Sequence, residues 1–129
     1  MEDLINKLRE EATKSPCSVI KFAASDGKVF SHNGEFYANC KDCKRTIIEQ
    51  PYPECKANHA EWGVLAKSDN PINLYIYCMT PDKKDYSFTR FWCKTCSILV
   101  PMFGTKNVFM WSGNEWIKKD ANKLIDDVQ

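Results

Sequence analysis

Two short cysteine motifs in this chain could hold a metal ion. Cys40 and Cys43 enclose Lys-Asp, and Cys93 and Cys96 enclose Lys-Thr. A Cys-x-x-Cys turn places both sulfurs on one side of the chain, so two such pairs supply the four thiolates of a tetrahedral zinc site. The spacing therefore predicts one structural Zn²⁺ bound by Cys40, Cys43, Cys93 and Cys96.

Disulfide bonds and redox chemistry are alternative uses of the same cysteines. Disulfides are typical of secreted chains, but residues 1–7 lack the apolar core of a signal peptide, and seven cysteines leave one unpaired. A redox dithiol opens a helix after a strand, and we expect no helix after either pair. We therefore favour zinc and a reducing compartment, either cytoplasmic or nuclear.

A second set of metal ligands is also available. Cys55 and His59 could join Cys40 and Cys43 in a Cys₃His site, although that arrangement would leave Cys93 and Cys96 unused. The remaining cysteines, Cys17 and Cys78, lie among apolar neighbours, so we expect them to be small core residues.

We predict no catalytic constellation. His32 and His59 lie far apart in the sequence, and the chain has no glycine-rich phosphate loop. We expect no glutamate beside a histidine or cysteine pair in the order that zinc deaminases use. A zinc ion with four thiolate ligands also has no open position for water. The expectation is a non-enzymatic domain.

Composition is that of an ordinary globular chain. The 129 residues suit a single domain over 1–129, with 43% hydrophobic and 27% charged residues. No apolar run approaches the roughly 18 residues that cross a bilayer, so no membrane partner is expected. The net charge of +1 comes from 18 basic and 17 acidic residues, so any nucleic-acid site must be a local patch.

The elements that must position the cysteine pairs read as strands between two helices. Apolar stripes predict helices over 3–14 and 115–128, which divides the domain into an N-terminal helix (1–16), a β-rich core (17–112) and a C-terminal helix (113–129). Strands are expected at 18–23, 29–30, 36–38, 46–48, 62–66, 72–79, 86–92, 98–103 and 108–111, the last two as a hairpin. The predicted fold class is α+β, mainly β, with zinc-stapled antiparallel sheets.

The cysteine pairs and the strands between them resemble the C-terminal RNA-binding domain of RIG-I-like and Dicer-related helicases, which has a zinc-binding β-tent fold. Over residues 36–119, Cys40-Lys41-Asp42-Cys43 is similar to the first pair of that family, His59 to its loop histidine and Cys93-Lys94-Thr95-Cys96 to its second pair. Trp116-Ile117-Lys118-Lys119 is similar to a Trp-Lys stretch near its end, whereas Ser97 to Pro101 replace its Trp-Gly. The resemblance implies binding of duplex RNA or its ends.

Basic and aromatic residues interleave around the second cysteine pair. Such a surface can stack a base on an aromatic ring while lysine or arginine contacts phosphate. The predicted nucleic-acid contacts are His59, Lys83, Lys84, Arg90, Phe91, Trp92 and Lys94. The alternative is that the aromatic residues fill the core, and that the chain is a zinc-ribbon-type protein-interaction or regulatory module, viral or otherwise, that binds no nucleic acid.

Overall fold

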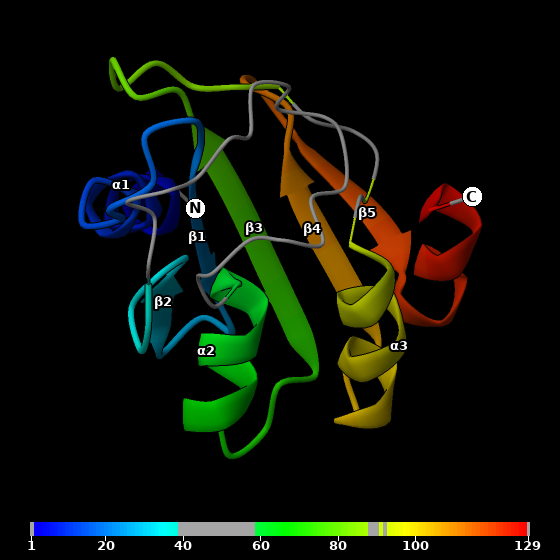
Figure 1. Cartoon of the computed structure of the whole chain (residues 1–129). Helices are drawn as coiled ribbons and strands as arrows, with labels where there is room; N and C mark the ends of the chain where they lie inside the picture. Colours follow the sequence, from blue (N-terminus) through cyan, green and yellow to red (C-terminus); the bar gives the residue numbers. More distant parts are fainter. Residues whose placement is uncertain (1, 39–58, 88–90, 92, 129) are drawn as a thin grey trace.

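The computed structural model describes residues 2–38, 59–87, 91 and 93–128 (Figure 1). The first cysteine pair, Cys55 and the strand expected at 46–48 lie outside these residues. The elements are α1 (Glu2–Ala12), β1 (Lys21–Ser25), β2 (Phe30–His32), α2 (Ala60–Lys67), β3 (Asn73–Met79), α3 (Lys94–Met102), β4 (Asn107–Trp111), β5 (Trp116–Asp120) and the 3₁₀-helix η1 (Ala121–Val128). Within these residues, every helix is too short or too polar to cross a bilayer.

One mixed sheet organises the molecule, with the strand order β2-β1-β3-β4-β5. Neighbouring strands are antiparallel except β3 and β4, which run parallel from Asn73 opposite Asn107 to Ile76 opposite Met110. A parallel pair needs a crossover, and α3 lies within the segment that makes it. The α+β class with flanking helices is confirmed, but the expectation of antiparallel sheets alone is wrong at this central pair.

Hydrophobic side chains pack on both faces of the sheet. Alternate residues of β3, including Leu74 and Ile76, join the core beneath α2, α3 and η1. The intervening Tyr77 and Met79 pack against α1 on the other face. Figure 1 shows α2 and α3 side by side on the same face of the sheet. Cys17 and Cys78 are buried in the larger core, as expected for small apolar residues.

The short apolar runs are where the expected elements and the observed ones differ. The helix expected at 3–14 and the strands expected at 72–79 and 108–111 correspond to α1, β3 and β4. Residues 62–66 belong to α2 and residues 98–103 largely to α3, so neither is a strand and no hairpin joins 98–103 to 108–111. The helix expected at 115–128 begins instead as strand β5, which pairs with β4 before η1 starts.

Strand β2 and helix α2 approach each other closely at Gly63. A methyl group added there would lie 1.7 Å from Oγ and 2.5 Å from Cβ of Ser31. We therefore expect Gly63→Ala to destabilise the fold by about 1–3 kcal/mol, although alanine is intrinsically the better helix former. Urea denaturation measures the change. The double variant Gly63→Ala/Ser31→Gly should recover part of the loss, and a single variant as stable as the parent would contradict this packing.

A partly buried ion pair links α1 to the segment that follows β3. Arg9 contacts Asp85 through two hydrogen bonds, of 3.1 Å from Nε and 2.7 Å from Nη2. The Tyr77 hydroxyl and the Trp111 indole N–H, the latter at 3.1 Å, donate to the same carboxylate. Partial burial of Asp85 opposes its ionisation, but the hydrogen bonds from Arg9, Tyr77 and Trp111 outweigh it and lower the pKa of Asp85.

The same carboxylate should make stability depend on pH. Because its pKa is lower in the folded than in the unfolded chain, Asp85 stabilises the fold above the unfolded pKa of about 3.9, and this contribution is lost as the pH falls further. We expect Asp85→Asn to cost about 2 kcal/mol at pH 7, and the difference from the parent to shrink below about pH 4. Urea denaturation at pH 7 and below pH 4 measures this difference in the free energy of unfolding. The exposed Asp126→Asn is the matched control, and a constant difference between Asp85→Asn and the parent at all pH values would refute the assignment.

Candidate metal centre

The N-termini of two helices bring His59, Cys93 and Cys96 together. His59 is the residue that precedes the first turn of α2, and Cys93 is the corresponding residue of α3. His59 Nδ1 lies 3.3 Å from Cys96 Sγ, and the ligand atoms of all three residues lie within 4.8 Å of one another. His59 of one helix start and the Cys93–Cys96 pair of the other therefore form one cluster, although they are far apart in the sequence.

The cluster has the ligands and dimensions of a zinc site. Zinc binds imidazole nitrogen at about 2.0–2.1 Å and thiolate sulfur at about 2.3 Å, so tetrahedral geometry places these two atoms about 3.6 Å apart. The observed distance of 3.3 Å between His59 Nδ1 and Cys96 Sγ is close to that value. Small adjustments of the three side chains would therefore suffice to hold the ion.

Local hydrogen bonds favour ionised sulfur at this position. The Cys96 backbone N–H, in the first turn of α3, donates to Cys93 Sγ at 3.1 Å. A hydrogen bond from the Cys96 thiol, together with His59, lowers the pKa of Cys93, whereas that same hydrogen bond and burial raise the pKa of Cys96. The pair thus holds one thiolate readily without a metal, and thiolate is the form that binds zinc.

Glu61 is a buried carboxyl group beside these ligands. It lies in the first turn of α2, two residues after His59, and only 6% of it is exposed. Burial raises the pKa of Glu61, and the nearby Cys93 adds to the effect while His59 opposes it. A buried acid with a raised pKa next to a metal-binding cluster is typical of a proton-transfer group.

The C-terminal 3₁₀-helix holds the chain just before the second cysteine pair. Asp127 Oδ2, in η1, accepts the backbone N–H of Phe91 at 3.0 Å. The same atom lies 2.7 Å from Lys119 Nζ of β5. Because Phe91 is two residues before Cys93, these contacts tie the start of α3 to the edge of the sheet and limit how far Cys93 can move.

The predicted site residues are distributed over several parts of the molecule. Cys93, Cys96 and His59 come together, while Cys40, Cys43, Arg90 and Trp92 lie outside the described residues. Lys94 is exposed in the first turn of α3, and Lys83 and Lys84 are exposed in the turn after β3. Phe91 is only 2% exposed and packs in the core. Its prediction as a residue that stacks on a base is therefore wrong.

Sequence reasoning missed Glu61 and misplaced His59. His59-Ala60-Glu61, followed by Cys93-Lys94-Thr95-Cys96, has the His-x-Glu and Cys-x-x-Cys order of zinc deaminases, with Trp92 where that signature has proline. The expectation that no helix follows a cysteine pair is wrong for the second pair, because α3 starts directly after Cys93, while the first pair lies outside the described residues. The apolar run after Glu61 predicts a strand, whereas these residues form α2, whose start brings His59 and Glu61 to the cluster.

Comparison with known proteins adds no relative. No family model, curated protein or solved structure matches this chain. The resemblance to the RNA-binding domain of RIG-I-like helicases stays a prediction.

Proposed function

We propose that this chain is a zinc-dependent hydrolytic deaminase that acts on the exocyclic amino group of a nucleobase. The observation that carries the proposal is the buried carboxyl of Glu61 beside the cluster of His59, Cys93 and Cys96. Zinc deaminases use one histidine and two cysteines as ligands and a glutamate that is not a ligand as the acid and base. This function replaces the non-enzymatic role expected from four thiolate ligands.

With only His59, Cys93 and Cys96 as ligands, the set that the described residues bring together, a tetrahedral zinc ion would keep one position for water. Zinc bound there would lower the pKa of that water and so supply a nucleophile near neutral pH. His59 and the two cysteines would fix the ion at the junction of α2 and α3. His59 and Cys93 lie directly before the first turns of α2 and α3, so the backbones of two helices that contact each other position them.

Glu61 would carry the protons of the reaction. In hydrolytic deamination the oxygen of water bonds to the ring carbon that bears the amino group, the carbon–nitrogen bond breaks, and ammonia leaves. The Glu61 carboxylate would take one proton from the water and deliver it to the adjacent ring nitrogen. It would then transfer the second proton to the departing amine. Water is the only co-reactant, and no electrons are exchanged.

Nucleic acid is the proposed source of the base. Lys94 lies exposed in the first turn of α3, next to Cys93, where its ammonium group can contact a phosphate beside the reacting base. The predicted RNA-binding role thereby becomes part of the proposed activity, with the base extruded from a single strand into the site. Zinc as the bound ion and RNA as the ligand belong to this proposal.

An assay of the zinc-loaded full chain tests the proposal. It would be incubated with cytidine, adenosine and single-stranded and duplex DNA and RNA, and mass spectrometry would detect bases in which a carbonyl replaces the amino group. We expect one of these bases to be converted with release of ammonia, and the conversion to stop when a chelator removes the metal. Complete absence of conversion by protein shown to contain zinc would refute the proposal.

A redox dithiol is a second candidate, because Cys93 and Cys96 open α3 and the pKa of Cys93 is lowered. The two functions predict different states of the purified protein. A deaminase should contain zinc and keep both thiols reduced in air while the metal is bound. A redox protein should lack zinc, form a Cys93–Cys96 disulfide and reduce a model disulfide substrate.

A further inference from the structure

The β4–β5 half of the sheet presents a polar and aromatic surface on the face that carries α1. Helix α1 packs against β1, β2 and β3. Beyond it, Tyr75, Phe109, Trp111 and Trp116 are each half-buried, and Lys118 and Asp120 are exposed. Val108 and Met110 point to the other face, into the core that includes Cys96. This surface and the metal centre therefore lie on opposite sides of the sheet.

Aromatic rings on this surface contact one another in a continuous cluster. Tyr75 and Phe109 stack with centroids 4.9 Å apart and planes inclined by 14°. Trp116 packs edge to face against Tyr75 at 5.4 Å and against Trp111 at 5.1 Å. The strand register explains the arrangement, because Tyr75, Phe109 and Lys118 are directly opposite one another on three adjacent strands. The stacked rings of Tyr75 and Phe109, here called the platform, therefore lie in line with the Lys118 side chain across three strands.

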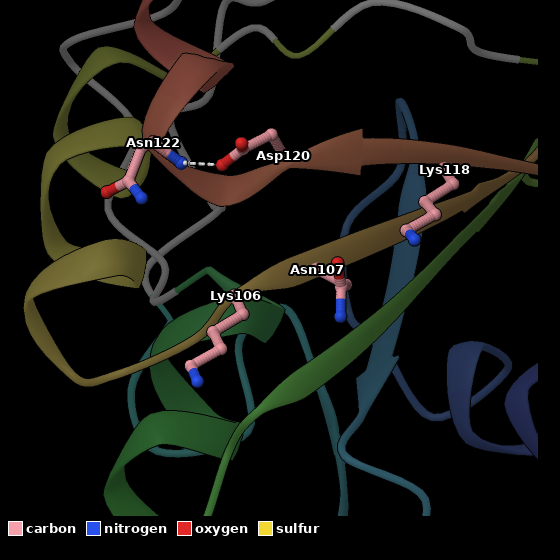
Figure 2. A pocket seen from close by; sticks show the side chains of 5 residues that line it. All are labelled: Lys106, Asn107, Lys118, Asp120 and Asn122. Carbon is pink, nitrogen blue, oxygen red and sulfur yellow. Dashed lines mark hydrogen bonds between the residues drawn. The ribbon is translucent and has the colours of Figure 1, made fainter.

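A shallow hollow of about 560 Å³ lies along β4 and β5 and includes Lys118 (Figure 2). Its lining residues are Lys106, Asn107, Lys118, Asp120 and Asn122. Figure 2 shows Asn107 between the two lysines, and the Asp120 carboxylate accepts the backbone N–H of Asn122 at 2.9 Å. Neither Lys106 nor Lys118 takes part in an ion pair within the described residues. Two ammonium groups therefore remain available to an anion.

We propose that this face binds single-stranded nucleic acid at a second site, separate from the metal centre. Bases would stack on Phe109 and its neighbouring rings, since every base offers an aromatic face. The phosphates would lie against Lys106 and Lys118, and the Asn107 amide would contact the sugar or phosphate oxygens. The combination of aromatic rings and two lysines on one face favours this occupant, because a strand supplies bases and phosphates at regular intervals. The Asp120 carboxylate in the same hollow accepts the backbone N–H of Asn122.

Fluorescence anisotropy with short labelled single strands of DNA and RNA tests the second site. We expect Phe109→Ala to weaken binding about 5- to 100-fold, because removal of one stacking platform has an effect of that size in comparable proteins. Lys118→Ala should reduce the slope of log affinity against log salt by about 0.7 for each phosphate that Lys118 neutralises in the parent. Lys28→Ala, in the exposed turn between β1 and β2, is the matched control and should leave both the affinity and the salt slope unchanged.

Activity on a free nucleoside separates this proposal from the proposed function. The Phe109 and Lys118 variants should convert the free nucleoside as the parent does while binding strands more weakly. If Phe109→Ala fails to fold, Lys118→Glu probes the same face through an exposed side chain. Unchanged strand binding in the Lys118 variants would overturn the proposal. So would sedimentation showing that the face pairs two copies of the chain.

Discussion

Replacement of Glu61 by glutamine is expected to abolish deamination while the protein keeps its zinc. Glutamine has nearly the shape of glutamate, so the packing around this buried position should survive. It cannot accept a proton from water or return one to the ring and the amine. Loss of a general acid and base lowers rates about 10²- to 10⁴-fold, so we expect at least a 100-fold fall in kcat. Ammonia release measures it.

The zinc content of the variant shows whether Glu61 carries protons or binds the metal. Glu61 is assigned as a proton carrier and not as a ligand, so Glu61→Gln should bind one equivalent of zinc, like the parent. Glu115→Gln, at an exposed position, is the control for a carboxyl-to-amide change and should retain full activity. If Glu61→Gln loses zinc, the carboxyl is a ligand. If it keeps both zinc and activity, Glu61 is not the acid and base.

The sequence predicts some elements of this fold and not others, for a physical reason. Strand β3 and helix α1 are predictable because each has an unbroken periodic pattern over seven or more residues. The runs after Glu61 and after Cys96 are shorter, and their buried residues fit a strand or a helix equally well. Burial in α2, for example, covers Ala60, Glu61, Gly63, Val64 and Leu65, which leaves little polar face to reveal the helical period. Only packing in the folded chain decides whether these two segments are helices or strands.

The candidate site depends on the same two segments, so it was only half predictable. Cys93 and Cys96 are recognisable from local spacing alone. Their contact with His59 requires both helices to start at the same end of the parallel β3–β4 pair, which spacing does not reveal. Glu61 could have been recognised by comparing the order His-x-Glu and Cys-x-x-Cys with zinc deaminases. Its burial, by contrast, is a property of the folded chain.

Variants of the ligands should distinguish this cluster from the four-thiolate site predicted from the sequence. If His59, Cys93 and Cys96 hold the ion, His59→Ala and Cys96→Ser should each weaken zinc binding at least about 100-fold, because loss of even an outer partner costs about 10–100-fold. The double variant Cys40→Ser/Cys43→Ser should keep its His59-dependent zinc. Under the four-thiolate arrangement the order reverses: the double variant loses the ion and His59→Ala retains it.

Stability should follow the metal, because an ion that binds only the folded chain stabilises it by mass action. At a free zinc concentration 100 times Kd this amounts to about 2.7 kcal/mol, which the parent should lose on chelation and Cys96→Ser should never gain. Zinc stoichiometry after dialysis and thermal unfolding with and without chelator measure both effects. Cys17→Ser, which removes a buried thiol far in sequence from the cluster, is the matched control and should keep its zinc. A parent chain that unfolds identically with and without chelator would show that no metal is held in the fold, and the proton transfer assigned to Glu61 would then have no nucleophile to act on.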